Sequence, residues 1–177
     1  IADEDEEVRS AAVAALKQLG RWGIQALLGQ LAQPDSGRRE LYAAALAQMG
    51  PTALALAQAR AFDPDVHVRL GVLAALSHAP EYADADVVLQ LVGDHEPSVR
   101  AAACQILGSI ASPQAAAALA EALHDRDEQV RHAAAVAMAH LGPLGLDTLV
   151  PRLLTGSGEL DAQVAQALVG FGAEGLS

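Results

Sequence analysis

The stretch that decides the fold is DHEPSVRAAACQILG, residues 94–108. Its apolar residues Val99, Ala103 and Leu107 recur every four positions, which places them on one face of an α-helix. Asp94 precedes this apolar pattern, where a carboxylate stabilises the exposed N–H groups and the positive end of a helix dipole. The stretch therefore predicts an amphipathic helix that begins after an acidic turn.

The same pattern recurs along the chain with a period of 30 or 31 residues. Five copies carry an arginine at the same position: Arg9, Arg39, Arg69, Arg100 and Arg131. The sixth copy has Asp161 at this position. Further helical stretches rich in Ala and Leu lie between these copies, at 24–32, 53–61, 85–92, 114–123 and 144–154. A single helical hairpin cannot bury the apolar faces of both its helices, whereas stacked hairpins can. We expect an all-α protein, an α-solenoid of about eleven helices in antiparallel pairs with no sheet.

The repeat pattern extends over the whole sequence. It predicts a single array over residues 1–177 with about five and a half repeats, opening on the second helix of a hairpin. Because neither end carries a polar capping repeat, we expect the array to be a piece of a longer chain.

Composition and charge exclude several functional classes. Of the 177 residues, 52% are hydrophobic, and the net charge of -11 disfavours nucleic acid and anionic membranes as partners. No apolar run approaches the roughly 18 residues of a membrane span. A single cysteine, Cys104, cannot form an intramolecular disulfide, and no secretory signal is visible. These features favour a cytoplasmic protein.

Three segments carry a resemblance to a known family: DPDVHVRLGVLAALS, DHEPSVRAAACQILG and DRDEQVRHAAAVAMAHLG. Their pattern resembles the short HEAT-like repeats of the phycobilisome-lyase type, and the resemblance covers essentially the whole chain. It implies a solenoid in which one helix of each hairpin lines a concave side. It also implies an alternative function, an accessory or lyase-type subunit that handles a bilin or another cofactor. Such repeats occur in proteins of many functions, so the resemblance alone selects none.

The repeated arginines favour a structural role. Carboxylates stand six residues before four of them, at Asp3, Asp63, Asp94 and Asp125. An arginine in the first helical turn is within reach of such a carboxylate in its own turn or in the next repeat. We therefore interpret these residues as a structural ladder along the stack, with an anion site as the alternative.

No catalytic or metal-binding constellation is evident. None of the six histidines has the i, i+3 or i, i+4 histidine partner that a helical metal site needs. Cys104 lies within a predicted packed helix and is interpreted as a small buried hydrophobe. The sequence predicts no catalytic residue, no metal and no cofactor.

The rare aromatic residues Trp22 and Tyr82, at helix entries, are expected to fill gaps between layers.

The remaining candidate is the outward face of the arginine-bearing helices, one, five and eight residues after each arginine. Seven of these positions form the candidate partner-binding concave face: Glu40, Leu70, Ala74, Gln105, His132, Val136 and Gln166. Its shallow, mildly apolar character suits a partner helix or an extended peptide, while solvent-exposed Ala chosen for helix propensity is the alternative. The leading hypothesis is a non-enzymatic scaffold that binds another protein or peptide, with no nucleic acid or membrane partner.

Overall fold

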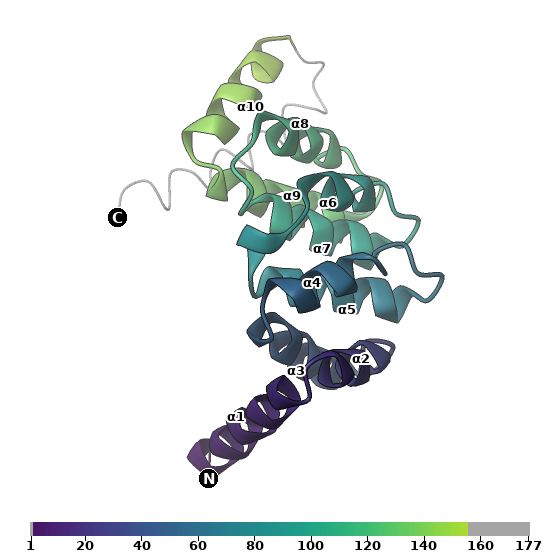
Figure 1. The fold of residues 1–177 in the computed structure, drawn as a ribbon. Coiled ribbons are helices and arrows are strands. Elements are labelled where there is room, and N and C mark those ends of the chain that lie inside the picture. The colour runs from purple at the N-terminus through teal and green to yellow at the C-terminus, as the bar shows by residue number, and fades with distance from the viewer. Residues whose placement is uncertain (1, 156–177) are drawn as a thin grey trace. The chain divides into compact units, whose positions relative to one another are not determined.

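A computed structural model describes the backbone of residues 2–155 and the side chains of residues 10–151. This part of the chain is all-α and has no strand (Figure 1). Its residues belong to two compact units, one that ends at Ala83 and one that begins at Asp84. The predicted fold class, an α-solenoid of stacked antiparallel hairpins, is confirmed. That the array forms a single domain stays a prediction.

The first unit contains five α-helices and one 3-10 turn. They are α1 (Ala2–Gln18), α2 (Arg21–Gln30), α3 (Ser36–Gln48), α4 (Pro51–Gln58), α5 (Val66–Ser77) and η1 (Pro80–Tyr82). The arginine-bearing helices α3 and α5 pack along each other, and each also packs on the helix that precedes it in the chain, α2 or α4. The unit is thus built from successive helical hairpins.

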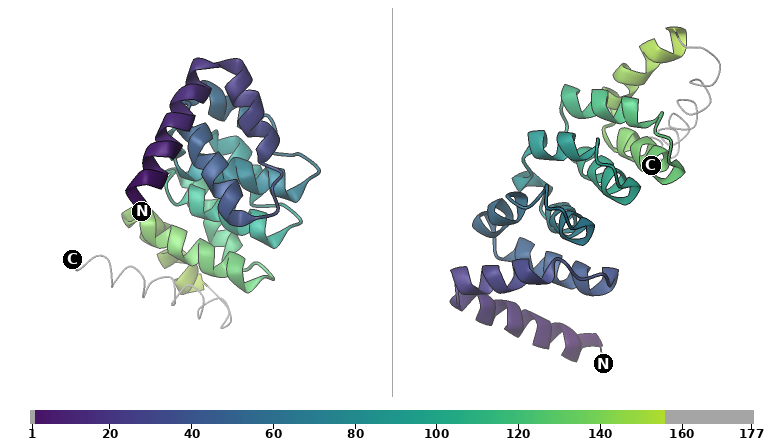
Figure 2. Two further views of the ribbon diagram at one scale, coloured as in Figure 1. Left: turned by 90° about the horizontal axis from the view of Figure 1, so that it is seen from below. Right: turned by 90° about the vertical axis from the view of Figure 1, so that its right-hand side faces the viewer.

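The second unit repeats this arrangement. Its helices are α6 (Ala85–Leu91), α7 (Pro97–Leu107), α8 (Pro113–Ala122), α9 (Glu128–His140) and α10 (Pro143–Thr155). The most extensive packing joins the arginine-bearing helices α7 and α9, while α6 packs on α7 and α8 on α9. Figure 2 shows the same hairpins from two further directions.

The core follows the columns that the sequence predicts. One residue before each arginine, and three and seven residues after it, the side chains of α5, α7 and α9 are buried: Val68, Val72, Leu76, Val99, Ala103, Leu107, Val130, Ala134 and Met138. The helix ends also follow the repeat. Gly20, Gly50 and Gly142 adopt φ of 55°, 90° and 57°, a region that residues with a Cβ rarely enter, so each allows the chain to turn into the next helix.

The prediction that aromatic residues fill gaps between layers is wrong for the helix entries. Trp22 is 80% exposed and Tyr82 is 45% exposed. Trp22 lies in the first turn of α2, and Tyr82 lies in the 3-10 turn η1. Aliphatic side chains, mostly Ala, Leu and Val, fill the interior of each unit instead.

Candidate functional site

The repeated arginines bind the main chain of their own interhelix turn. In four repeats Nη1 donates a hydrogen bond to the carbonyl oxygen six residues earlier. These bonds join Arg39 to Gln33 (3.0 Å), Arg69 to Asp63 (2.9 Å), Arg100 to Asp94 (2.9 Å) and Arg131 to Asp125 (2.9 Å). Because the carbonyl oxygens of an interhelix turn have no helical N–H partner, the arginine satisfies them and fixes the turn.

Arg100 also reaches the turn carboxylate of the next repeat. Its Nε and Nη2 donate to the two carboxylate oxygens of Asp125, both at 2.7 Å, in a bidentate pair whose arginine is 5% exposed. The Arg100 guanidinium holds the pKa of Asp125 below its usual range. The main-chain N–H of Asp127 also donates to Asp125. The pair therefore joins two successive repeats.

Asp63 has a different partner, which the sequence did not reveal. Arg60 donates to its Oδ2 from Nε (3.3 Å) and Nη2 (2.8 Å), and Arg60 Nη1 donates to the carbonyl oxygen of Leu28 (3.0 Å). Arg60 does not occupy the repeated arginine position, so the alignment of the repeats gave no indication of its contact with Asp63. The expected carboxylate contacts of Arg69 and Arg131 stay predictions.

The acidic turns cap the helices that follow them. The carboxylates of Asp35, Asp65 and Asp127 accept hydrogen bonds from the N–H groups of Arg38, His67 and Gln129, at 2.9 Å each. Glu96, in the equivalent position before α7, makes no such cap. These side chains account for much of the repeated acidic character of the turns.

Cys104 lies in the interior of α7 and has no exposed surface. Burial raises the pKa of its thiol to about 12. A thiol must ionise and be accessible in order to attack a ligand. This cysteine, the only one in the sequence, therefore gives no support to attachment of a bilin.

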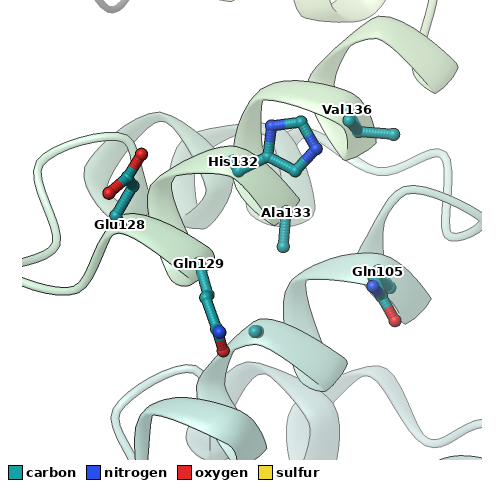
Figure 3. A pocket seen from close by; sticks show the side chains of 7 residues that line it. Gln105, Glu128, Gln129, His132, Ala133 and Val136 are labelled. Atoms are coloured by element: carbon teal, nitrogen blue, oxygen red, sulfur yellow. The ribbon is translucent and has the colours of Figure 1, made fainter.

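A groove runs between α7 and α9 in the second unit. It has a volume of about 640 Å³ and is lined by Ala101, Gln105, Glu128, Gln129, His132, Ala133 and Val136. Three of the predicted face residues thus lie together here. Figure 3 shows Gln105 on α7 and the Gln129 side chain directed from α9 toward α7. His132 and Val136 follow on α9, and Glu128 lies at the N-terminal end of that helix. Gln129 and Glu128 were not among the predicted residues because they precede the arginine.

The polar side chains of the groove have no partner among the described residues. Over the described part of the chain, the side chains of Gln105, Glu128, Gln129 and His132 make no hydrogen bond or ion pair, and all four are exposed. The charged turn residues beside them, by contrast, are tied into caps and into the Arg100–Asp125 pair. The floor of the groove includes Ala101 and Ala133, and Val136 is 41% exposed.

The corresponding face of the first unit is different. Glu40 on α3 contacts His78 at the end of α5, with Oε1 and Nε2 2.6 Å apart. Leu70 and Ala74 on α5 are half-buried. The side chain of Arg9 and the whole of Gln166 lie outside the described residues.

In the repeat of Arg100, the residue eight positions after the arginine is Gly108, and it does not lie on an open face. Gly108 is buried, and a Cβ added to it would lie 2.9 Å from the Cα of Ala137 on α9. The assignment of this offset to the candidate face is therefore wrong for α7, because the close approach of α7 and α9 uses it.

Within the described residues, no group of three or more His, Cys, Asp or Glu side chains is placed to hold a metal ion. Among the same helices, none combines the length and apolar character that crossing a bilayer requires.

Comparison with known proteins supports the repeat assignment. Residues 85–170 match the family model of HEAT repeats. No curated protein sequence matches the chain. A designed armadillo repeat protein in complex with the peptide (KR)4 has a TM-score of 0.52 and 16% identity, with 94% of each chain covered.

Two further solved structures are similar. Computationally designed armadillo repeat proteins for modular peptide recognition have a TM-score of 0.52 and 19% identity, with 94% of each chain covered. An engineered protein has a TM-score of 0.51 and 20% identity, covering 94% of this chain and 88% of its own. At these identities the likeness is one of fold. Neither comparison confirms the narrower resemblance to the phycobilisome-lyase type. The 30–31-residue period and the stacked hairpins make the chain an α-solenoid, and its residues 85–170 are similar to HEAT repeats.

Proposed function

We propose that the protein is a non-enzymatic scaffold that binds an extended segment of another protein in the groove between α7 and α9. The observation that carries this proposal is the combination of free polar side chains and an apolar floor in one groove. A volume of about 640 Å³ lies in the range of ligand-binding clefts. An extended peptide needs hydrogen-bond partners for its own N–H and C=O groups, and Gln105 and Gln129 offer both donors and acceptors.

The chemistry elsewhere in the described chain supports binding rather than catalysis. The arginines fix turns, the turn carboxylates cap helices, and the Cys104 thiol is buried with a raised pKa. The fold gives further support, since two of the similar designed proteins are described with a bound peptide or as modules for peptide recognition. The candidate face residues Glu40, Leu70 and Ala74 of the first unit are an additional contact surface in this proposal.

The test uses a displayed library of random peptides selected on the full chain. We expect enriched peptides to lose about ten-fold or more in affinity for Val136→Glu, because a carboxylate would be forced into the apolar part of the groove. Val150→Glu is the matched control, since Val150 on α10 is 45% exposed and does not line the groove. Circular dichroism should show the same helical content for both variants. Peptides that bind both variants as tightly as the unaltered chain would place the binding site elsewhere.

A further inference from the structure

The lining of the groove carries one carboxylate and no arginine or lysine. Glu128 is exposed at the first position of α9, and Asp127 already supplies the helix cap through Gln129 N–H. No described side chain pairs with the Glu128 carboxylate, so it can pair with a charge brought by a partner. Arg100 and Arg131, the nearest repeated arginines, are directed into the turns, where they bond Asp94 and Asp125 carbonyl oxygens.

The net charge of the second unit is negative, like that of the Glu128 carboxylate. Residues 84–151, whose side chains the structure describes in this unit, contain nine Asp and Glu against three Arg, a net charge of -6. A field of one sign around a groove raises the local concentration of oppositely charged ligands and their association rate. Both the local carboxylate and the wider charge thus favour a cationic partner.

The distance between the two ends of the groove sets the spacing between the two partner side chains that contact them. Glu128 and Val136 stand eight residues apart on α9, about 12 Å along the helix at 1.5 Å per residue. An extended strand advances about 3.3 Å per residue, so about four residues cover that length. Side chains four residues apart point to the same side of a strand. One extended segment can therefore place a basic residue beside Glu128 and an aliphatic residue beside Val136.

We infer that the groove between α7 and α9 binds a basic extended peptide, with a lysine or arginine on Glu128 and an aliphatic side chain four residues away against Val136. The inference rests on the proposed function and specifies its partner. Gln105 and Gln129 hydrogen-bond the main chain of the bound segment, and Ala101 and Ala133 allow that main chain to approach the helices closely.

The test measures fluorescence anisotropy of four short Ser- and Thr-rich peptides with the full chain at low ionic strength. The first carries a lysine and a valine four residues apart. In the second and third, glutamine or glutamate replaces the lysine, and in the fourth the valine is moved by one position. We expect the lysine peptide to bind about two- to five-fold more tightly than the glutamine peptide, the range for an exposed ion pair. The glutamate peptide should bind most weakly, and moving the valine should lower affinity.

Variants of Glu128 test whether its carboxylate causes the preference for the lysine peptide. Glu128→Gln should abolish the difference between the lysine and glutamine peptides, and Glu128→Lys should reverse the preference toward the glutamate peptide. His132→Lys should weaken the lysine peptide by adding a positive charge to the lining. Asp147→Asn on α10 is the matched control: Asp147 is exposed and does not line the groove, so its loss should leave the preference intact.

The outcomes separate this inference from the proposed function. If all four peptides bind equally and Val136→Glu weakens them all, the groove is a docking site but the charge preference is overturned. If the glutamate peptide binds best, the partner is acidic and the inference is wrong. If Glu128→Gln and Asp147→Asn, which each remove one negative charge, change the preference equally, the effect belongs to net charge and not to this groove. Library-selected peptides that are insensitive to Val136→Glu contradict the proposed function itself.

Discussion

Arg100 serves two turns at once, and its surroundings show what the repeated arginine contributes. Nη1 holds the carbonyl oxygen of Asp94 in its own turn, while Nε and Nη2 hold both carboxylate oxygens of Asp125 in the next. A lysine has a charge but no planar fork of donors, so it cannot form all three bonds together. The residue type is thus dictated by geometry as well as by charge.

Arg100→Ala should destabilise the fold strongly. It leaves Asp125 in a largely buried position without its bidentate partner, and loss of one member of a buried pair costs about 3–5 kcal/mol. Because 15% of the Asp125 side chain is exposed and it keeps the bond from Asp127 N–H, we expect the lower part of that range. Urea denaturation monitored by circular dichroism measures the change in unfolding free energy.

Arg100→Lys should recover part of this loss, while Arg38→Ala, at an exposed position, should lie within about 0.5 kcal/mol of the unaltered chain. Equal stability of Arg100→Ala and the unaltered chain would show that the pair adds nothing to the fold.

At the scale of the elements, helix contacts depend on small residues where two helices approach closely. Gly108, at the end of α7, faces Ala137 of α9, and Gly71 of α5 faces Leu31 after α2. The α7–α9 contact is also the contact that forms the base of the groove, since Ala101 and Ala133 line it. Close helix packing and the shape of the candidate site therefore have the same cause.

Gly108→Ala tests this contact. A Cβ would lie 2.9 Å from Ala137 Cα and 3.0 Å from its Cβ, so one of the two helices must shift. We expect a loss of about 1–3 kcal/mol, as for overpacking of a core. The control is Gly29→Ala in α2, where an added Cβ meets nothing within 4 Å. That change should stabilise the chain by about 0.5–1 kcal/mol, because alanine loses less backbone entropy than glycine in a helix. Opposite signs in thermal unfolding would support the assignment, and a loss in both variants would contradict it.

For the whole molecule, the charge of -11 and the capped carboxylates act in opposite directions with pH. Lowering the pH toward the isoelectric point of 4.8 reduces repulsion among carboxylates. The folded-state pKa of Asp125 is lowered by the bond from Arg100, and that of Asp63 by the bonds from Asp65 N–H and Arg60. A lowered carboxyl pKa stabilises the folded state above the unfolded value of about 3.9, and this stability is lost as pH falls through the folded value.

We therefore expect the midpoint of thermal unfolding to stay level or rise slightly from pH 7 to pH 5, and to fall below about pH 4. Asp125→Asn should start lower at pH 7 and fall less steeply below pH 4, because one carboxylate with a lowered pKa has been removed. Differential scanning calorimetry across this range makes the comparison. An equally steep fall in Asp125→Asn would show that other carboxylates set the acid response.

The sequence by itself determined the helices, their buried faces and the acidic turns that precede them. Val99, Ala103 and Leu107 share a face because of the 3.6-residue turn, and Asp127 caps α9 because a short carboxylate reaches the N–H two residues later. These relations act within a few residues, so the period of 30 or 31 residues was enough to place the hairpins and to indicate the solenoid.

Only the tertiary structure decided which distant groups meet. It brings Arg60 Nη1 to the carbonyl oxygen of Leu28, buries Gly108 against α9, leaves Trp22 exposed and places Gln105 of α7 across a groove from Gln129 of α9. Each outcome depends on the distance and rotation between packed helices, which the hydrophobic period does not specify because it fixes a face and not the neighbour that covers it. The candidate site arises from that packing, since no neighbouring turn or helix of the described chain supplies a partner to its polar side chains.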